Sequence, residues 1–267
     1  MKIALVSNWQ TRECGVANFG RDWASALERA GHDVLRLHYG LSVPANQVDV
    51  ALYNWHPSTT PKVLTPPFCP YAVYLHDIPP HSSCRLVDGA KAVWAAEPTP
   101  GAEVIRYPVY DGPRDTPPRS PGISIGWTGL RGDGRDSLRD LCERRGWTFN
   151  GSNGWKDTPE EIARLASSTL IVLWYFADGR GQSLALSTAC AAGCPILVNQ
   201  SRMFGLAHDY PQEIYRAGHD PAVPFLEQAI EGVLAKIYTG RAAVPAQAVV
   251  EQSWTRAIQR MERAWRD

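Results

Sequence analysis

Short runs of apolar residues alternate along the chain with longer stretches in which apolar residues recur every three to four positions. The first run spans residues 2–7, and the stretch after it places Val16, Phe19, Trp23 and Leu27 on one helical face, with Gly31 as a C-terminal stop. Apolar runs predict buried strands, and the wider spacing predicts amphipathic helices. Further strands are predicted at residues 34–37, 48–53, 71–75, 90–95 and 103–107. Strands separated by crossover segments predict a parallel sheet.

The same alternation starts again after a proline-rich stretch. Residues 113–121, PRDTPPRSP, show no apolar periodicity and have the composition of a semi-rigid linker. Strands are predicted beyond it at 123–126, 147–150, 170–175 and 213–216, and helices at 135–145, 158–165, 223–238 and 249–265. The helix at 158 is marked by the capping-box pattern TPEE.

The pattern therefore predicts an α/β protein with two Rossmann-like, doubly wound domains facing each other across a cleft. The N-terminal domain is predicted at residues 1–112, the linker at 113–121 and the C-terminal domain at 122–248. The closing helical segment, 249–267, is expected to pack back on the N-terminal domain.

Residues 174–200, WYFADGRGQSLALSTACAAGCPILVNQ, form the densest cluster of signals in the chain. They predict a buried strand, a glycine-rich loop, a helix that begins at Ser183 and ends at Gly193, and a second buried strand. Glycines allow close backbone approach to a ligand, and the unpaired N–H groups of a helix N-terminus favour an anion such as a diphosphate. The alternative is a plain connection between two strands.

Two predicted strands of the first domain end on histidine. His56 follows one strand, and His76 with Asp77 follows another. Ligands of open parallel sheets lie at the carboxyl ends of the strands, so His76 and Asp77 are candidate catalytic residues. The alternatives are a structural histidine bonded to the backbone and an aspartate that caps the next turn. His56 is either structural or part of an acceptor site.

The composition of the chain argues against several classes of function. The 27 basic and 27 acidic residues balance, so the chain has no overall field that attracts nucleic acid or an acidic membrane. The six cysteines form no CxxC pair and have no metal-ligand spacing with histidine. No stretch of 18 apolar residues and no cleavable leader is visible, so we expect a cytoplasmic protein without a transmembrane segment.

Four segments in this order resemble the retaining GT-B glycosyltransferases of family 4. They are ECGVANFGRDWASALERAGHDV, YAVYLHDIPP, the CAAGCPILV portion of residues 174–200, and EQSWTRAIQRMERAWRD. Together they cover nearly the whole chain, and their shared order is more specific than any one motif.

The resemblance implies sugar transfer from a nucleotide-sugar donor, UDP- or GDP-linked, to a hydroxyl acceptor with retention of configuration. The donor is expected mainly on the second domain and the acceptor mainly on the first. The glycine loop at Gly15 is expected near the donor diphosphate or the acceptor, and His76 near the transferred sugar. No cofactor and no metal are expected, and the sequence contains no DxD triplet.

The chain departs from the family at the donor site. Where the family has two glutamates eight positions apart, this sequence has Arg180 and Thr188, and the position of a family arginine falls on Trp127. We predict that nearby arginines hold the diphosphate, because a guanidinium binds phosphate oxygens in pairs. The predicted donor-binding set is Gly15, Arg131, Arg135, Arg180, Gly181, Gln182, Ser183 and Thr188.

Two functions remain open from the sequence. One is a compact, divergent glycosyltransferase, whose acceptor is a small molecule, a glycan or DNA carrying hydroxymethyl-pyrimidines. The other is a GT-B-like protein that binds a nucleotide or a partner without transferring sugar.

Overall fold

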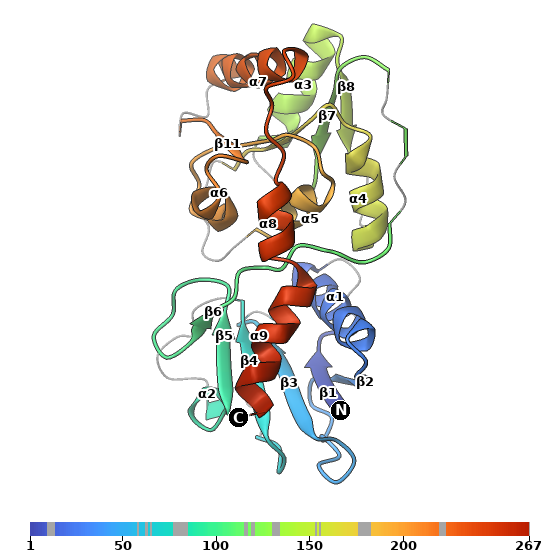
Figure 1. Cartoon of the computed structure of the whole chain (residues 1–267), viewed down its shortest axis with the longest axis vertical. Helices are drawn as coiled ribbons and strands as arrows, with labels where there is room; N and C mark the ends of the chain where they lie inside the picture. The colour runs from blue at the N-terminus through green and yellow to red at the C-terminus, as the bar shows by residue number, and fades with distance from the viewer. Residues whose placement is uncertain are drawn as a thin grey trace. The chain divides into compact units, whose positions relative to one another are not determined.

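The computed structural model describes residues 1–9, 14–57, 59–61, 64, 66–76, 85–114, 117–118, 121–129, 134–152, 154, 156–175, 183–218 and 223–266. The chain divides into two compact units, labelled by element in Figure 1. Unit 1 comprises Met1–Pro108 and Trp254–Asp267, and unit 2 comprises Val109–Ser253.

Unit 1 is built on a six-stranded parallel sheet in the order β2-β1-β3-β4-β5-β6. Its strands are β1 (Lys2–Ser7), β2 (Asp33–His38), β3 (Val50–Trp55), β4 (Tyr71–Leu75), β5 (Ala92–Ala95) and β6 (Glu103–Val104). Strand β1 pairs with β2 on one side and with β3 on the other, so the winding of the chain reverses there. The carboxyl ends beside such a reversal are where ligands bind in open α/β sheets.

The helices of unit 1 are α1 (Gly15–Arg29), α2 (Arg85–Asp88) and α9 (Trp254–Arg266). Aromatic side chains hold α1 and α9 in the core of this unit. Phe19 of α1 contacts Trp254 at 5.0 Å between ring centroids, and Trp94 of β5 contacts Trp265 at 5.8 Å. The last segment of the chain thus completes the core of its first unit, and Figure 1 shows α9 on this sheet.

Unit 2 repeats the architecture with a five-stranded parallel sheet in the order β11-β10-β9-β7-β8. Its strands are β7 (Ser124–Trp127), β8 (Thr148–Gly151), β9 (Leu170–Leu173), β10 (Ile196–Val198) and β11 (Tyr215–Arg216). Its helices are α3 (Arg135–Arg145), α4 (Thr158–Ala166), α5 (Leu184–Ala191), α6 (Gly205–Asp209), α7 (Val223–Tyr238) and α8 (Ala246–Glu251).

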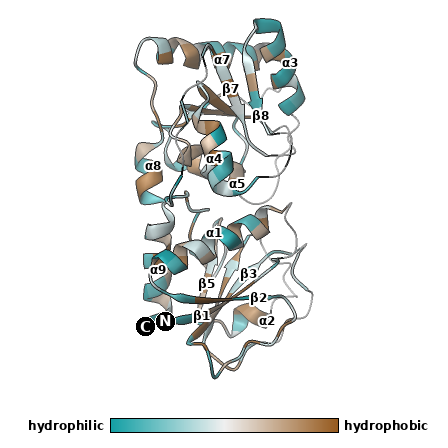
Figure 2. Cartoon of the chain, turned by 90° about the vertical axis from the view of Figure 1, so that its right-hand side faces the viewer, coloured by the Kyte–Doolittle hydropathy of each residue, from teal (hydrophilic) through white to brown (hydrophobic). Residues whose placement is uncertain are grey.

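Separate apolar clusters cover the two faces of the second sheet. One contains residues of α4, α5, α6 and α8, and the other contains residues of α3 and α7. Helix α3 is largely hydrophilic in Figure 2, and the residues that it buries are Leu138, Leu141 and Cys142. Helices on both faces of two parallel sheets confirm the predicted fold class.

Two local predictions were wrong. The segment predicted as one helix from 249 is divided into α8 and α9, because the backbone at Gln252 and Ser253 pairs with Val109 instead. The capping box is also absent. Asp157, not Thr158, is the N-cap residue of α4, its side chain makes no cap bond, and Glu161 pairs with Arg164.

Candidate functional site

Buried polar side chains gather at the carboxyl ends of β1, β3 and β4 in unit 1. Ser7 ends β1, Asn54 is the penultimate residue of β3, and His76 follows β4. Ser7 and Asn54 are completely buried, and His76 is 3% exposed. Since a buried polar group without a partner is costly, these side chains satisfy one another.

Both ring nitrogens of His76 are engaged within unit 1. Its Nδ1 lies 2.8 Å from the hydroxyl of Tyr107, and its Nε2 bonds the side-chain oxygen of Asn54. The ring of Phe19 stands edge-on against the imidazole at 4.6 Å. Burial, and then the nearby ring of His56, lower the pKa of His76 well below its usual value. His76 is therefore neutral at physiological pH.

The structure gives less support to the predicted roles of the other candidate residues in unit 1. Gly15 begins α1, and a Cβ added there would meet no atom of the described residues within 4 Å, so packing against them does not require glycine at this position. His56 is half-buried, and its ring lies 6.2 Å from that of His76. Asp77 lies outside the described residues.

In unit 2 the candidate donor side lies at the start of α5. Ser183 is the N-cap residue of α5, as predicted, but its side chain makes no cap bond. Its N–H donates to the carbonyl of Met203 at 2.9 Å. Thr188, one turn into the helix, is 8% exposed, and its hydroxyl donates to the carbonyl of Leu184 at 3.1 Å. The Thr188 oxygen keeps a lone pair that can accept from a ligand hydroxyl.

Tyr175, just after β9, connects the end of that strand to the start of α5 through its side chain. Its ring stacks on Phe204 at 5.2 Å and stands edge-on to Trp127 at 6.0 Å. Burial raises the pKa of its phenol, against a smaller lowering by a hydrogen bond with Ser183. Asn199, after β10, holds the Tyr175 backbone by accepting from its N–H and donating to its carbonyl.

Of the arginines predicted to bind phosphate, Arg135 is the one that the structure describes. It is the first residue of α3, and its Nη2 donates to the carbonyl of Ser152 at 2.9 Å, while its guanidinium lies over Phe149 at 5.7 Å. Its buried Nε has no hydrogen-bond partner among the residues that the structure describes. Arg135 thus holds the segment after β8 in place. The other predicted ligands, Arg131, Arg180, Gly181 and Gln182, lie outside the described residues.

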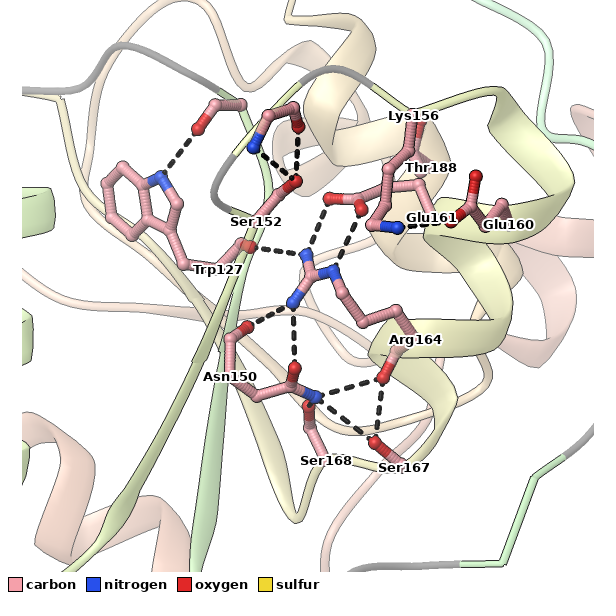
Figure 3. Close-up of polar contacts among 12 residues, drawn as sticks. Trp127, Asn150, Ser152, Lys156, Glu160, Glu161, Arg164, Ser167, Ser168 and Thr188 are labelled. Atoms are coloured by element: carbon pink, nitrogen blue, oxygen red, sulfur yellow. Dashed lines mark hydrogen bonds and ion pairs between the residues drawn. The ribbon is translucent and has the colours of Figure 1, made fainter.

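The sequence did not reveal a polar cluster centred on Arg164 of α4 (Figure 3). Its guanidinium donates to the Trp127 carbonyl at 2.7 Å and to both oxygens of Asn150, and it pairs with Glu161 through two bonds of 2.5 and 2.9 Å. The two side chains of the ion pair are 16% and 9% exposed. This cluster fixes the carboxyl ends of β7 and β8 to α4, a helix that packs on α5.

Among the described residues, no group of three or more His, Cys, Asp or Glu side chains has an arrangement that holds a metal ion. The described helices include none that is long and apolar enough to cross a membrane.

Comparisons of the sequence alone found no relative: no protein-family profile matches the chain, and no curated protein sequence does.

Comparison of the structure found glycosyltransferases along the full length of the chain. HepE from Anabaena, in complex with UDP and glucose, has 12% identity and a TM-score of 0.62, with 98% of each chain covered. A glycosyltransferase from Rickettsia africae has 11% identity and a TM-score of 0.67, with 99% of this chain and 97% of that chain covered. An α-glucosyltransferase in complex with UDP and a 13-mer DNA has 11% identity and a TM-score of 0.66, with both chains fully covered.

These similarities show the fold. The chain has the GT-B architecture of two parallel α/β units, and the three similar structures named above are glycosyltransferases, two of them with UDP bound.

Proposed function

We propose that the protein is a glycosyltransferase that moves a sugar from a nucleotide-sugar donor to a hydroxyl acceptor. The supporting observation is full-length structural similarity to glycosyltransferases, including HepE in complexes with UDP and with UDP-glucose. UDP-linked donors are therefore the first to test, with GDP-linked donors next.

In this proposal the donor diphosphate binds unit 2 at the start of α5, where the helix dipole and arginine side chains favour it. Ser183, Arg131, Arg135, Arg180, Gly181 and Gln182 are the proposed ligands, and Thr188 accepts from the ribose. Gly15, at the start of α1, is proposed near the diphosphate or the acceptor. His76 and Asp77 are proposed near the transferred sugar. Because burial favours the neutral form of His76, it would act there without a positive charge.

Retention of configuration and independence from metal follow from the family resemblance and belong to the proposal. A glycosyl transition state carries positive charge at the ring and leaves negative charge on the departing diphosphate. Preorganised donors aimed at that diphosphate supply the stabilisation in the absence of a cation.

The acceptor is a hydroxyl of a small molecule, a glycan or a hydroxymethylated DNA base. The α-glucosyltransferase in complex with DNA makes the last class worth including in a screen.

Calorimetric titration tests the donor site. We expect one of UDP, GDP, ADP and TDP to bind the purified protein in the presence of a metal chelator. Binding that appears only after Mg²⁺ or Mn²⁺ is added would overturn metal independence, and failure of all four nucleotides under both conditions would overturn the donor site.

A donor screen read by mass spectrometry tests transfer. We expect release of sugar from one nucleotide-sugar, and a strong loss of that turnover in His76→Ala with nucleotide affinity retained. An unchanged rate in His76→Ala would remove His76 from the mechanism. Nucleotide binding without turnover on any donor or acceptor would instead support the binding protein that the sequence left open.

A further inference from the structure

The Asn54 side chain joins three other elements of unit 1. Its amide nitrogen donates to Ser7 Oγ at the end of β1 and to the carbonyl of Val16 in the first turn of α1, both at 2.8 Å. Its amide oxygen bonds Nε2 of His76 after β4. Asn54 itself is completely buried, so water does not compete for these bonds.

These bonds determine which nitrogen of His76 carries the proton. The Val16 carbonyl can only accept, so the nitrogen of the Asn54 amide must point toward it and the oxygen must point toward His76. An amide oxygen only accepts, and His76 Nε2 is therefore the protonated nitrogen. Nδ1 is then the acceptor, and the Tyr107 hydroxyl donates to it at 2.8 Å.

Helix α1 approaches this network closely. A Cβ on Gly20 would lie 2.5 Å from Ser7 Oγ and 3.1 Å from the Asn54 nitrogen. The absence of a side chain at Gly20 lets the first turn of α1 come within reach of Asn54. The network thus connects the end of β4 to the first turn of α1, the helix that begins at Gly15.

We propose that Asn54 is a positioning residue of the transferase site: it holds His76 as the Nε2–H tautomer and ties it to the first turn of α1. The proposal rests on the proposed function for its catalytic meaning, but its geometry is independent of any substrate. A fixed tautomer matters because Nε2–H donates to Asn54 while Nδ1 accepts from Tyr107, so the orientation of the ring is held from both sides.

Nuclear magnetic resonance of histidine-labelled protein tests the tautomer directly. With the His76 signal assigned through His76→Gln, we expect the ¹⁵N shifts of the unmodified chain to show a protonated Nε2 and an unprotonated Nδ1. Tyr107→Phe should leave that tautomer unchanged, because Asn54 and not Tyr107 dictates it. An Nδ1–H tautomer in the unmodified chain, or a switch in Tyr107→Phe, would overturn the proposal.

Asn54→Asp tests whether the side chain at position 54 controls the pKa of His76. A carboxylate facing Nε2 stabilises the imidazolium, so the pKa of His76 should rise by at least about one unit. The described titratable groups that face the ring are Tyr107, His56 and Tyr74, and none of them is changed. Asn46→Asp makes the same substitution at an exposed site of unit 1 and should leave the pKa of His76 unchanged. An unchanged pKa in folded Asn54→Asp would contradict the proposal.

Kinetics separate positioning from simple packing. In Asn54→Asp we expect kcat for donor turnover to fall at least about tenfold while the donor KM changes less than about twofold, the pattern of a lost transition-state interaction. A parallel loss of donor affinity would indicate general damage and overturn the positioning role. If the unmodified chain turns over no donor, the proposed function fails, whereas the tautomer and the pKa shift still decide the Asn54–His76 coupling.

Discussion

At Gly20, helix α1 passes so close to Ser7 and Asn54 that a methyl group does not fit. Gly20→Ala should lower the free energy of unfolding by about 1–3 kcal/mol, as for overpacked cores, and should disturb the network around His76. Gly232→Ala is a matched control in α7, where a Cβ would meet nothing within 4 Å. There we expect a stabilisation of about 0.5–1 kcal/mol from helix propensity. Denaturant titration measures both, and equal effects would contradict the packing argument.

The neutral state of His76 makes stability depend on pH. Its pKa is lowered in the folded protein, so the unfolded chain binds the proton more readily. The stability that this residue contributes is present above the unfolded pKa of about 6.5 and is lost as the pH falls below it. Unfolding measured between pH 7.5 and pH 5 should show a steeper fall for the unmodified chain than for His76→Gln. Identical slopes would show that protonation of His76 does not destabilise the folded protein.

The sequence placed His76 at a strand end because an apolar run stops there. It did not indicate that Asn54 would bind the ring. The two residues are 22 positions apart on adjacent strands, and they meet only because β3 and β4 pair in the register Trp55 to Leu75. A histidine at a strand end has the same sequence signal whether its nitrogens are free or engaged, so its environment had to come from the structure.

Helix α4 depends on Arg164 for its attachment to the carboxyl ends of β7 and β8. Arg164→Leu leaves the Glu161 carboxylate buried without its partner and frees the carbonyls of Trp127 and Asn150. Breaking one side of a buried pair costs about 3–5 kcal/mol. Thermal denaturation should show this loss, and Glu161→Gln in the same chain should restore part of it.

Arg139→Leu is the control on α3. Arg139 is half exposed and pairs with the exposed Asp136 and Asp140, and such surface pairs contribute about 0–1 kcal/mol. If Arg164→Leu and Arg139→Leu lower the stability by the same amount, the Arg164 cluster does not hold α4.

At the scale of elements, the sequence predicted most strands and helices, because fully buried parallel strands form nearly continuous apolar runs and the helices carry periodic apolar faces. It failed where tertiary contacts override local pattern. Apolar periodicity continues from α8 into α9, but the pairing of Val109 with the backbone at Gln252 and Ser253 ends the first helix. The TPEE pattern predicted a capping box, but Glu161 forms an ion pair with Arg164 instead of bonding to the start of the helix.

For the whole molecule, the order of the segments in the chain differs from their grouping in space. Helix α9 follows unit 2 in the sequence but belongs to unit 1. Its buried face packs against residues from the first hundred positions, through contacts of Trp254 with Phe19 and of Trp265 with Trp94. Its Glu262 also pairs with His32 at 2.6 Å. Unit 1 is therefore incomplete until the last residues of the chain are present.

Deletion of residues 254–267 should unfold unit 1 and leave unit 2 folded. Each large apolar side chain removed from the core costs about 1.5–3 kcal/mol, and α9 buries Trp254, Ile258, Met261 and Trp265, which together approach the roughly 5–15 kcal/mol that stabilises a typical domain. Hydrogen exchange read by mass spectrometry should show loss of protection in β4 and β5, while β9 and β10 stay protected. Tyr238→Ala, which removes a 67% exposed aromatic at the end of α7, should change neither unit. Retained protection in β4 and β5 would show that unit 1 folds without α9, and equal loss in both units would show that they unfold together.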